Sequence, residues 1–121
     1  MTIATWIASA LLAALYLMAG GMKAFLPAAR IPKQFPFVED FGVGGVRVIG
    51  ALELLGAVGV ILPRLTGILP ILAPIAATAL VVVQVLAIIV HLRRKETQSL
   101  PFNVVLLLLA AFVAIAGFAG F

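Results

Sequence analysis

The sequence contains no cysteine and only one histidine. Without cysteine the chain has no disulfides, thiolate metal sites, cysteine nucleophiles or dithiol relays, which excludes the small membrane enzymes that reach quinone through paired cysteines. One histidine cannot supply a bis-histidine haem site, and no carboxylate cluster suggests a metal site. There is also no Gly-rich phosphate loop, no Ser, His and Asp set and no glycosidase-like carboxylate pair. As a lone catalyst the chain is poorly equipped.

Charged residues are scarce as well, and their scarcity indicates that the protein is surrounded mainly by lipid and not by water. Charged residues make up 10% and hydrophobic residues 65% of the 121 positions, whereas soluble domains carry roughly a quarter charged and about half apolar residues. A soluble chain this short exposes much of its surface and needs a polar shell. Too few polar residues are present for that shell, so the composition predicts an integral membrane protein in contact with the lipid bilayer.

Four apolar stretches are long enough to cross a bilayer, which takes about 20 apolar residues per helix. They cover residues 3–22, 44–62, 68–90 and 102–121. No internal repeat or composition break divides them, so we expect an all-α transmembrane four-helix bundle, formed as one domain over residues 1–121. The first five residues carry no basic side chain, which argues for a retained first helix and against a secretory signal.

Most basic residues lie in two of the links between these spans. The first and third links of a four-span protein share a side, and the positive-inside rule places links 23–43 and 91–101 in the cytoplasm and both termini outside. This pattern accounts for the net charge of +4 without a nucleic-acid partner. The six basic residues of these links are Lys23, Arg30, Lys33, Arg93, Arg94 and Lys95, against Arg64 alone on the opposite side.

Charged side chains inside the spans usually face the bundle interior, because exposure to lipid costs a few kcal/mol or more. Glu53 lies near the middle of the second span and shares a helix face with Gly50 and Gly56, which predicts a closely packed interface. Arg47 lies six residues earlier, about 120° around the helix, which favours extension toward the cytoplasmic boundary over pairing with Glu53.

Two further polar residues are expected at the depth of Glu53. Tyr16 lies seven residues before Lys23 and Gln84 lies seven residues before His91, so each is about two turns from the cytoplasmic end of its helix. A second layer nearer the cytoplasm would hold Lys23, Arg47, His91 and Asn103. We therefore expect one polar cluster in the cytoplasmic half of the bundle, made of Tyr16, Glu53, Gln84, Arg47, Lys23 and His91.

This cluster has two interpretations. In the structural one, Glu53 is protonated and bonded to Gln84 and Tyr16, which fixes the helix register. In the functional one, Glu53 handles a proton or a ligand, since intramembrane ionisable groups mark functional sites. His91 beside Arg93 is most simply an interfacial histidine.

Proline and small residues shape the last two spans. Pro70 and Pro74 open the third span and predict a kink at its outer end. The fourth span carries small residues at four-residue spacing, typical of close helix packing. They could serve the bundle or a homo-oligomer interface, and both alternatives stay open. These residues are Ala110, Ala114, Ala116 and Gly120.

Three segments, taken in order, resemble the DoxX-like family of small membrane proteins. The first helix ends in Ala-Gly-Gly-Met-Lys-Ala-Phe at residues 19–25, and the third in Ala-Ile-Ile-Val-His at residues 87–91. The second carries Glu-Leu-Leu-Gly at residues 53–56 and closes at Pro63. The resemblance covers nearly the whole chain, and Lys23, Glu53 and His91 match recurring family positions.

The resemblance implies a four-helix protein of the bacterial plasma membrane. The family takes its name from a subunit linked to thiosulfate:quinone oxidoreduction, and some relatives are associated with membrane oxidoreductases in oxidative-stress defence. It thus implies quinone as a cofactor and an oxidoreductase as a partner. The leading hypothesis is a non-catalytic subunit or scaffold that presents Arg93, Arg94 and Lys95 to that partner. The alternatives are a proton-coupled transporter or a lipid- or quinone-binding bundle using Glu53, and a membrane assembly chaperone.

Overall fold

The computed structural model describes residues 2–30, 38–98 and 100–120, with side chains from residue 41 onward in the second range. Within these ranges the chain forms α1 (Ile3–Phe25), α3 (Val38–Thr66), α4 (Leu72–Arg93) and α5 (Leu100–Phe118). Each is long and apolar enough to cross a membrane. The expected all-α transmembrane four-helix bundle is confirmed.

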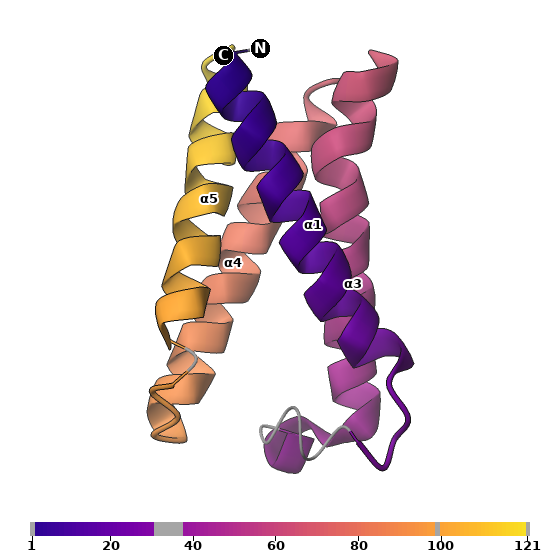
Figure 1. Ribbon diagram of the computed structural model, residues 1–121, viewed down its shortest axis with the longest axis vertical. Helices are drawn as coiled ribbons and strands as arrows, with labels where there is room; N and C mark the ends of the chain where they lie inside the picture. Colours follow the sequence, from indigo (N-terminus) through magenta and orange to yellow (C-terminus); the bar gives the residue numbers. More distant parts are fainter. Residues whose placement is uncertain (1, 31–37, 99, 121) are drawn as a thin grey trace.

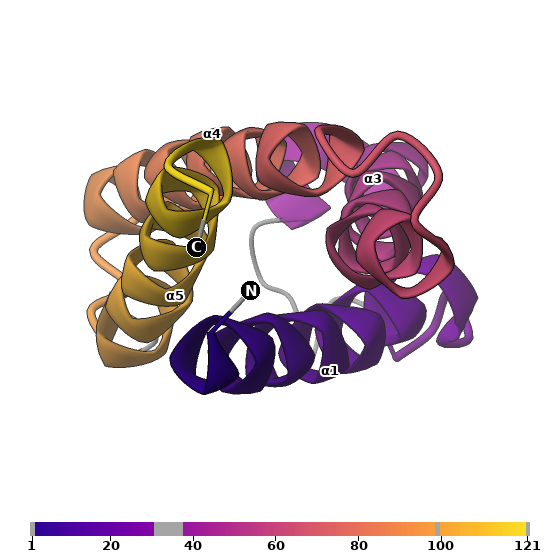
Figure 2. The ribbon, with the colours of Figure 1, turned by 90° about the horizontal axis from the view of Figure 1, so that it is seen from above.

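The helices form an antiparallel ring. α1 packs most extensively on α3 and α4 on α5, while α3 meets α4 and α1 closes the ring on α5. Both ends of the chain and the α3–α4 turn lie at one end of the bundle, and the described parts of the other two links lie at the opposite end (Figures 1 and 2). The most extensive helix packing is therefore between helices that follow one another in the chain.

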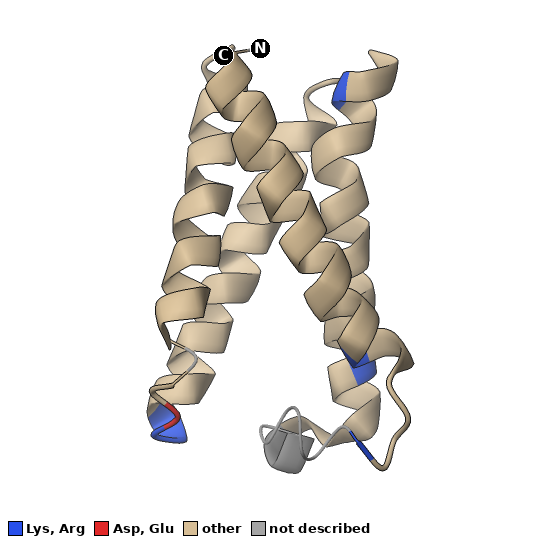
Figure 3. Cartoon of the chain, viewed as in Figure 1, with Lys and Arg blue, Asp and Glu red and all other residues tan. Residues whose placement is uncertain are grey.

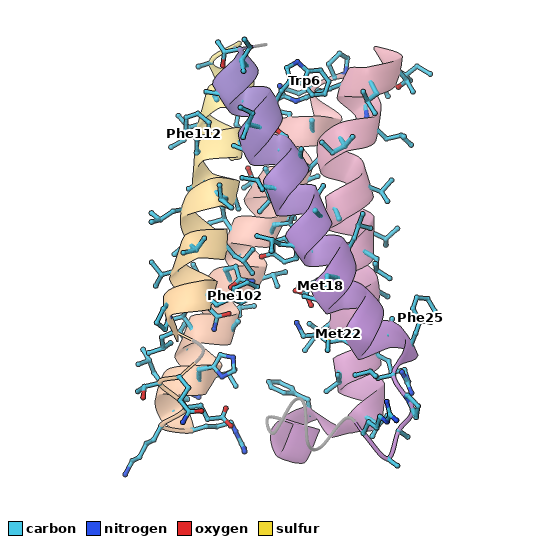
Figure 4. All side chains as sticks on the ribbon, in the orientation of Figure 1. Trp6, Met18, Met22, Phe25, Phe102 and Phe112 are labelled. Atoms are coloured by element: carbon cyan, nitrogen blue, oxygen red, sulfur yellow. The ribbon has the colours of Figure 1, made fainter. Side chains whose placement is uncertain are left out.

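Small and polar residues distinguish the inside of the ring from its outside. The exterior is apolar along its length, with Leu55 and Ile115 each 70% exposed, as expected for a surface in lipid. Figure 4 shows Phe112 directed outward from α5 and Phe25 outward from the end of α1. The core is built on a few large side chains among alanines, and comprises chiefly Leu12, Tyr16, Leu80, Leu106, Ala77, Ala110 and Val113.

A capping threonine sets the start of α1, and a glycine interrupts α3 near its start. Thr2 caps α1, because its hydroxyl oxygen accepts from the Thr5 amide at 3.2 Å. α3 starts earlier than the predicted span, as a short helical turn before Gly42. Gly42 has φ +73°, a left-handed conformation that interrupts the helix and that glycine adopts without a steric penalty.

The α3–α4 turn lies later than the sequence suggests. The link expected at residues 63–67, between the second and third spans, is helical up to Thr66, although Pro63 inside this last part of α3 has no amide hydrogen to donate to the preceding turn. Gly67, with φ +72°, ends the helix. α4 then begins at Leu72 and places Pro74 in its first turn, where a missing amide donor is tolerated. Pro70 precedes the helix, so these prolines set its start rather than a kink.

Candidate functional site

α1 and α3 touch through two glycines. A Cβ atom on Gly20 would lie 2.8 Å from the Gly50 carbonyl oxygen, and one on Gly50 would lie 2.7 Å from the Gly20 carbonyl oxygen. Side chains larger than hydrogen would force the helices apart at this point. The glycine face predicted beside Glu53 is therefore a backbone-to-backbone contact.

This contact brings two opposite charges together inside the bundle. Lys23 Nζ lies 2.6 Å from Glu53 Oε1, and the two side chains are 14% and 1% exposed. The Lys23 Cβ lies directly over Gly50, one turn along α3 from Glu53. The lysine stem thus crosses the glycine and delivers its ammonium to the carboxylate. Pairing offsets much of the cost of holding either charge in a low-dielectric interior.

Sequence reasoning did not find this pair. It placed Lys23 in a separate layer near the cytoplasm and assigned Tyr16 and Gln84 as the partners of Glu53. A lysine carries its charge on a flexible four-carbon stem, so the depth of its backbone does not fix the depth of its ammonium. One sequence signal could have predicted the pair. Lys23 and Glu53 each lie three residues after a glycine, Gly20 and Gly50, on two successive helices.

Arg47 caps the end of α1. Its guanidinium donates to the carbonyl oxygens of Ala24 at 2.6 Å and Leu26 at 2.7 Å, with a longer bond of 3.4 Å to that of Lys23. The last carbonyls of a helix have no intrahelical donor and carry partial negative charge, so a guanidinium is a suitable partner. Arg47 points away from Glu53, as its helical position predicts, and joins α3 to α1 a second time.

Tyr16 links α1 to α4 at a neighbouring level. Its hydroxyl is fully buried and donates to the Leu80 carbonyl oxygen at 3.3 Å. The Gln84 side chain and the Glu53 carboxylate both lie within interaction range of this hydroxyl. Close packing of α3 on α4 makes this arrangement possible, since Gly56 lies against the Leu80 side chain. The structure therefore brings Tyr16, Glu53 and Gln84 into one cluster with Lys23.

Among the buried polar atoms that lack a hydrogen-bond partner in the described part of the chain, three belong to uncharged side chains: Ser9 Oγ, Gln84 Oε1 and Asn103 Nδ2. Their side chains face the interior of the ring, with Ser9 fully buried. Sequence reasoning missed Ser9, although its spacing was a signal. Ser9, Tyr16 and Lys23 recur every seven residues, two helical turns, and so form one polar stripe along α1.

His91 lies at the end of α4 and contacts the link that follows it. Its Nδ1 atom lies 3.1 Å from Glu96 Oε1, and the same carboxylate oxygen lies 3.2 Å from Arg94 Nε. These three residues tie the end of α4 to this link. His91 is therefore part of the basic end of the bundle, with Arg93 and Lys95.

The cluster offers hydrogen bonding and one ion pair. Within the described ranges no group of three His, Asp or Glu side chains could hold a metal ion. The buried carboxylate is occupied by Lys23, and the tyrosine hydroxyl by a backbone oxygen. The Gln84 amide oxygen and the Asn103 amide nitrogen, which lack partners among the described residues, stay open to another molecule.

The fold and this internal polar cluster define a four-helix multi-pass integral membrane protein. The DoxX-like family model matches residues 7–113, which extend from the first turns of α1 into the last turns of α5. The chain belongs to the DoxX-like family. Comparison with curated proteins and with solved structures found no match.

Proposed function

We propose that this DoxX-like protein is a non-catalytic subunit or scaffold of a membrane oxidoreductase system. One observation carries the proposal: Glu53, the acid deepest in the bundle, is 1% exposed and paired with the chain's own Lys23. A proton-coupled carrier needs a carboxylate that alternates between a proton and its substrate, whereas this carboxylate joins two helices. The intramembrane charges therefore support a framework role.

The basic end of the bundle is the surface that we assign to the partner. Arg93 and Lys95 are exposed there, while Arg94 and His91 are engaged with Glu96. By the positive-inside rule this end faces the cytoplasm and the termini lie outside. We assign the protein to the bacterial plasma membrane, in keeping with its family.

The backbone at this end fixes where α4 stops. Lys95 has φ +58°, a left-handed conformation that costs a non-glycine residue about 1 kcal/mol. The bond from the Glu96 amide to the His91 carbonyl oxygen, at 2.8 Å, closes the helix cap around it. The cap ends α4 before Lys95, which is exposed in the link.

The test is purification from native membranes in mild detergent, followed by quantitative mass spectrometry of the accompanying proteins. We expect a stoichiometric oxidoreductase with the wild-type chain and its loss with the double variant Arg93→Gln/Lys95→Gln. Arg30→Gln removes a charge from another link at the same end and should retain the partner. Wild-type protein that purifies alone, or as a homo-oligomer without a redox protein, would contradict the proposal.

The unpaired amides favour a second candidate, a bundle that binds a quinone or a similar ligand with a polar ring. Gln84 Oε1 is a free acceptor and Asn103 Nδ2 a free donor, and both side chains are buried. A carbonyl-bearing ring with apolar edges fits such surroundings, because a buried polar atom without a partner costs about 1–3 kcal/mol. When bound, a quinone would supply two-electron redox chemistry to the partner.

Extraction of the purified protein with organic solvent and analysis for quinone tests this candidate. We expect quinone in the wild-type protein and less of it in Gln84→Leu, since leucine cannot bond to a ring oxygen. Thr78→Val, an exposed position on the same helix, is the matched control. Repeated absence of quinone from wild-type preparations would count against it.

A further inference from the structure

Arg64 is the one described basic residue at the end of the bundle opposite to all the others (Figure 3). It lies in the last turn of α3, half-buried, and its guanidinium lies against Gly117 of α5. Pro74, in the first turn of α4, borders the same place, since a Cβ atom on Gly117 would lie 2.8 Å from the Pro74 Cβ. Three helices thus meet around this guanidinium.

The guanidinium has no anionic partner in the described part of the chain. Its Nε atom is buried and makes no hydrogen bond there. The four acidic residues cannot reach it: Glu53 is paired with Lys23, Glu96 is in the link after α4, and Glu39 and Asp40 begin α3 at the other end. Arg47 and Lys23, by contrast, both end on acceptors supplied by the bundle.

The ends of three helices surround Arg64. The N-terminal end of α4 carries the positive end of its dipole and no side chain caps it, whereas the C-terminal ends of α3 and α5 carry negative ends that favour a cation. The helix dipoles therefore hold the guanidinium here without supplying a hydrogen-bond acceptor for its buried Nε atom. Because the first amides of α4 bond to the preceding turn, as in Leu72 to Leu69 at 2.9 Å, the guanidinium is the group at this place with a donor left for an anion.

The surroundings indicate where the anion comes from. Arg64 is two residues from the end of a helix that is long and apolar enough to cross a membrane, and the end of such a helix reaches the head-group region. The apolar side chains around it are strongly exposed, as in a protein surface that faces acyl chains: Leu65, Ile68, Leu69, Ile71, Leu72 and Phe118. Basic pockets between transmembrane helices bind lipid head groups, and a guanidinium matches phosphate oxygens in a two-pronged geometry.

We propose that Arg64, held between α3, α4 and α5 at Gly117, binds the phosphate of a membrane phospholipid in the leaflet on the side of the termini. This site is independent of the oxidoreductase partner, since it lies at the other end of the bundle. An arginine that only reached for water would extend past the end of α3, whereas this one lies against α5, and glycine at position 117 leaves the space for it.

Native mass spectrometry of delipidated protein in detergent tests the site. The probes are phosphatidylglycerol and, as a phosphate-free lipid with the same chains, diacylglycerol. We expect saturable binding of phosphatidylglycerol only, weakened about tenfold or more by Arg64→Gln, because a charge-assisted bond is lost. Arg64→Lys keeps the charge without the two-pronged geometry and should weaken binding less. Arg30→Gln, an exposed arginine at the other end, should leave it unchanged.

Two results would overturn the proposal. Equal phosphatidylglycerol affinity for the wild type, Arg64→Lys and Arg64→Gln would show that Arg64 is not the site. Calorimetric titration with inorganic phosphate separates the sources of the anion: Arg64-dependent binding of inorganic phosphate without binding of phosphatidylglycerol would assign the site to a free anion. Should Arg64→Gln fail to fold, the comparison of the wild type with Arg64→Lys decides alone.

Discussion

Lys23 Nζ and Glu53 Oε1 lie 2.6 Å apart, and they come from two helices whose backbones touch one turn away. The ion pair and the glycine contact therefore depend on each other. The glycines let the helices approach until the lysine stem can reach the carboxylate. The ion pair in turn stabilises both charges between the helices, where an unpaired charge would be costly.

A double-mutant cycle on this pair should show strong coupling. Lys23→Met leaves the buried Glu53 carboxylate without its cation, and we expect a loss of about 3 kcal/mol in the free energy of unfolding. Glu53→Gln should cost less, because the ammonium of Lys23 is closer to the end of its helix and can turn outward. The double variant should be more stable than the sum of the two losses predicts. Unfolding by SDS in mixed micelles, followed by circular dichroism, measures all four proteins, and strictly additive losses would contradict the coupling.

Two adjacent glycines on α1 should respond in opposite ways to alanine. Gly20→Ala places a Cβ 2.8 Å from the Gly50 carbonyl oxygen and should destabilise the bundle by about 1–3 kcal/mol. Gly21 has open space around it and is the matched control. Gly21→Ala should be neutral or stabilise the protein by up to about 1 kcal/mol, because alanine favours the helix. The same SDS titration applies, and equal effects of the two changes would argue against the close contact.

Removal of the Arg47 cap should loosen the end of α1 specifically. Arg47→Gln cannot reach both the Ala24 and Leu26 carbonyl oxygens with charged donors. We therefore expect amide hydrogen exchange in residues 22–26 to become about tenfold faster, as loss of charged hydrogen bonds implies. Arg47→Lys should give a smaller change, since one ammonium replaces a two-pronged donor. Arg30→Gln controls for net charge, and unchanged exchange in Arg47→Gln would show that the cap contributes nothing.

The natural absence of cysteine makes the membrane orientation easy to measure. Single cysteines at Ala29, Ile68 and Thr97 occupy exposed positions in the three links. Under the positive-inside assignment, a membrane-impermeant maleimide added to intact cells should label Ile68→Cys and leave Ala29→Cys and Thr97→Cys unlabelled until the membrane is opened. The opposite labelling would invert the topology, and with it the side on which we place the partner surface.

Hydropathy and helix geometry predicted the fold because they depend on composition over many residues. The four spans follow from the run of apolar side chains, and the burial of Glu53 follows from the glycines on its face. The predicted second link, at residues 63–67, was less accurate, because α3 continues to Thr66 and α4 starts only at Leu72. Pro63 is accommodated inside α3, and whether Pro74 kinks a helix depends on where that helix starts.

The pairing of side chains within the site was harder to predict than the position of the site along the helices. Lys23 and Arg47 have long side chains, so their charges can meet groups well removed from their backbones, and the choice of partner depends on the angle and distance between α1 and α3. His91 illustrates the same limit, because its contact with Glu96, five residues later, depends on how the chain turns after α4. Asn103 was expected in the layer nearer the cytoplasm, and the lack of a partner for its Nδ2 atom among the described residues could be found only from the packed structure.

The order of the ion pair along the chain bears on how the protein enters the membrane. Lys23 ends the first span and Glu53 lies in the second, so the two charged segments leave the ribosome one after the other and can associate as a hairpin before the remaining spans are made. Each charge would otherwise oppose the insertion of its own segment. A neutral hairpin reduces that barrier, and the second half of the chain, which carries no charge between Ile68 and Val90, can then insert against a partner already in place.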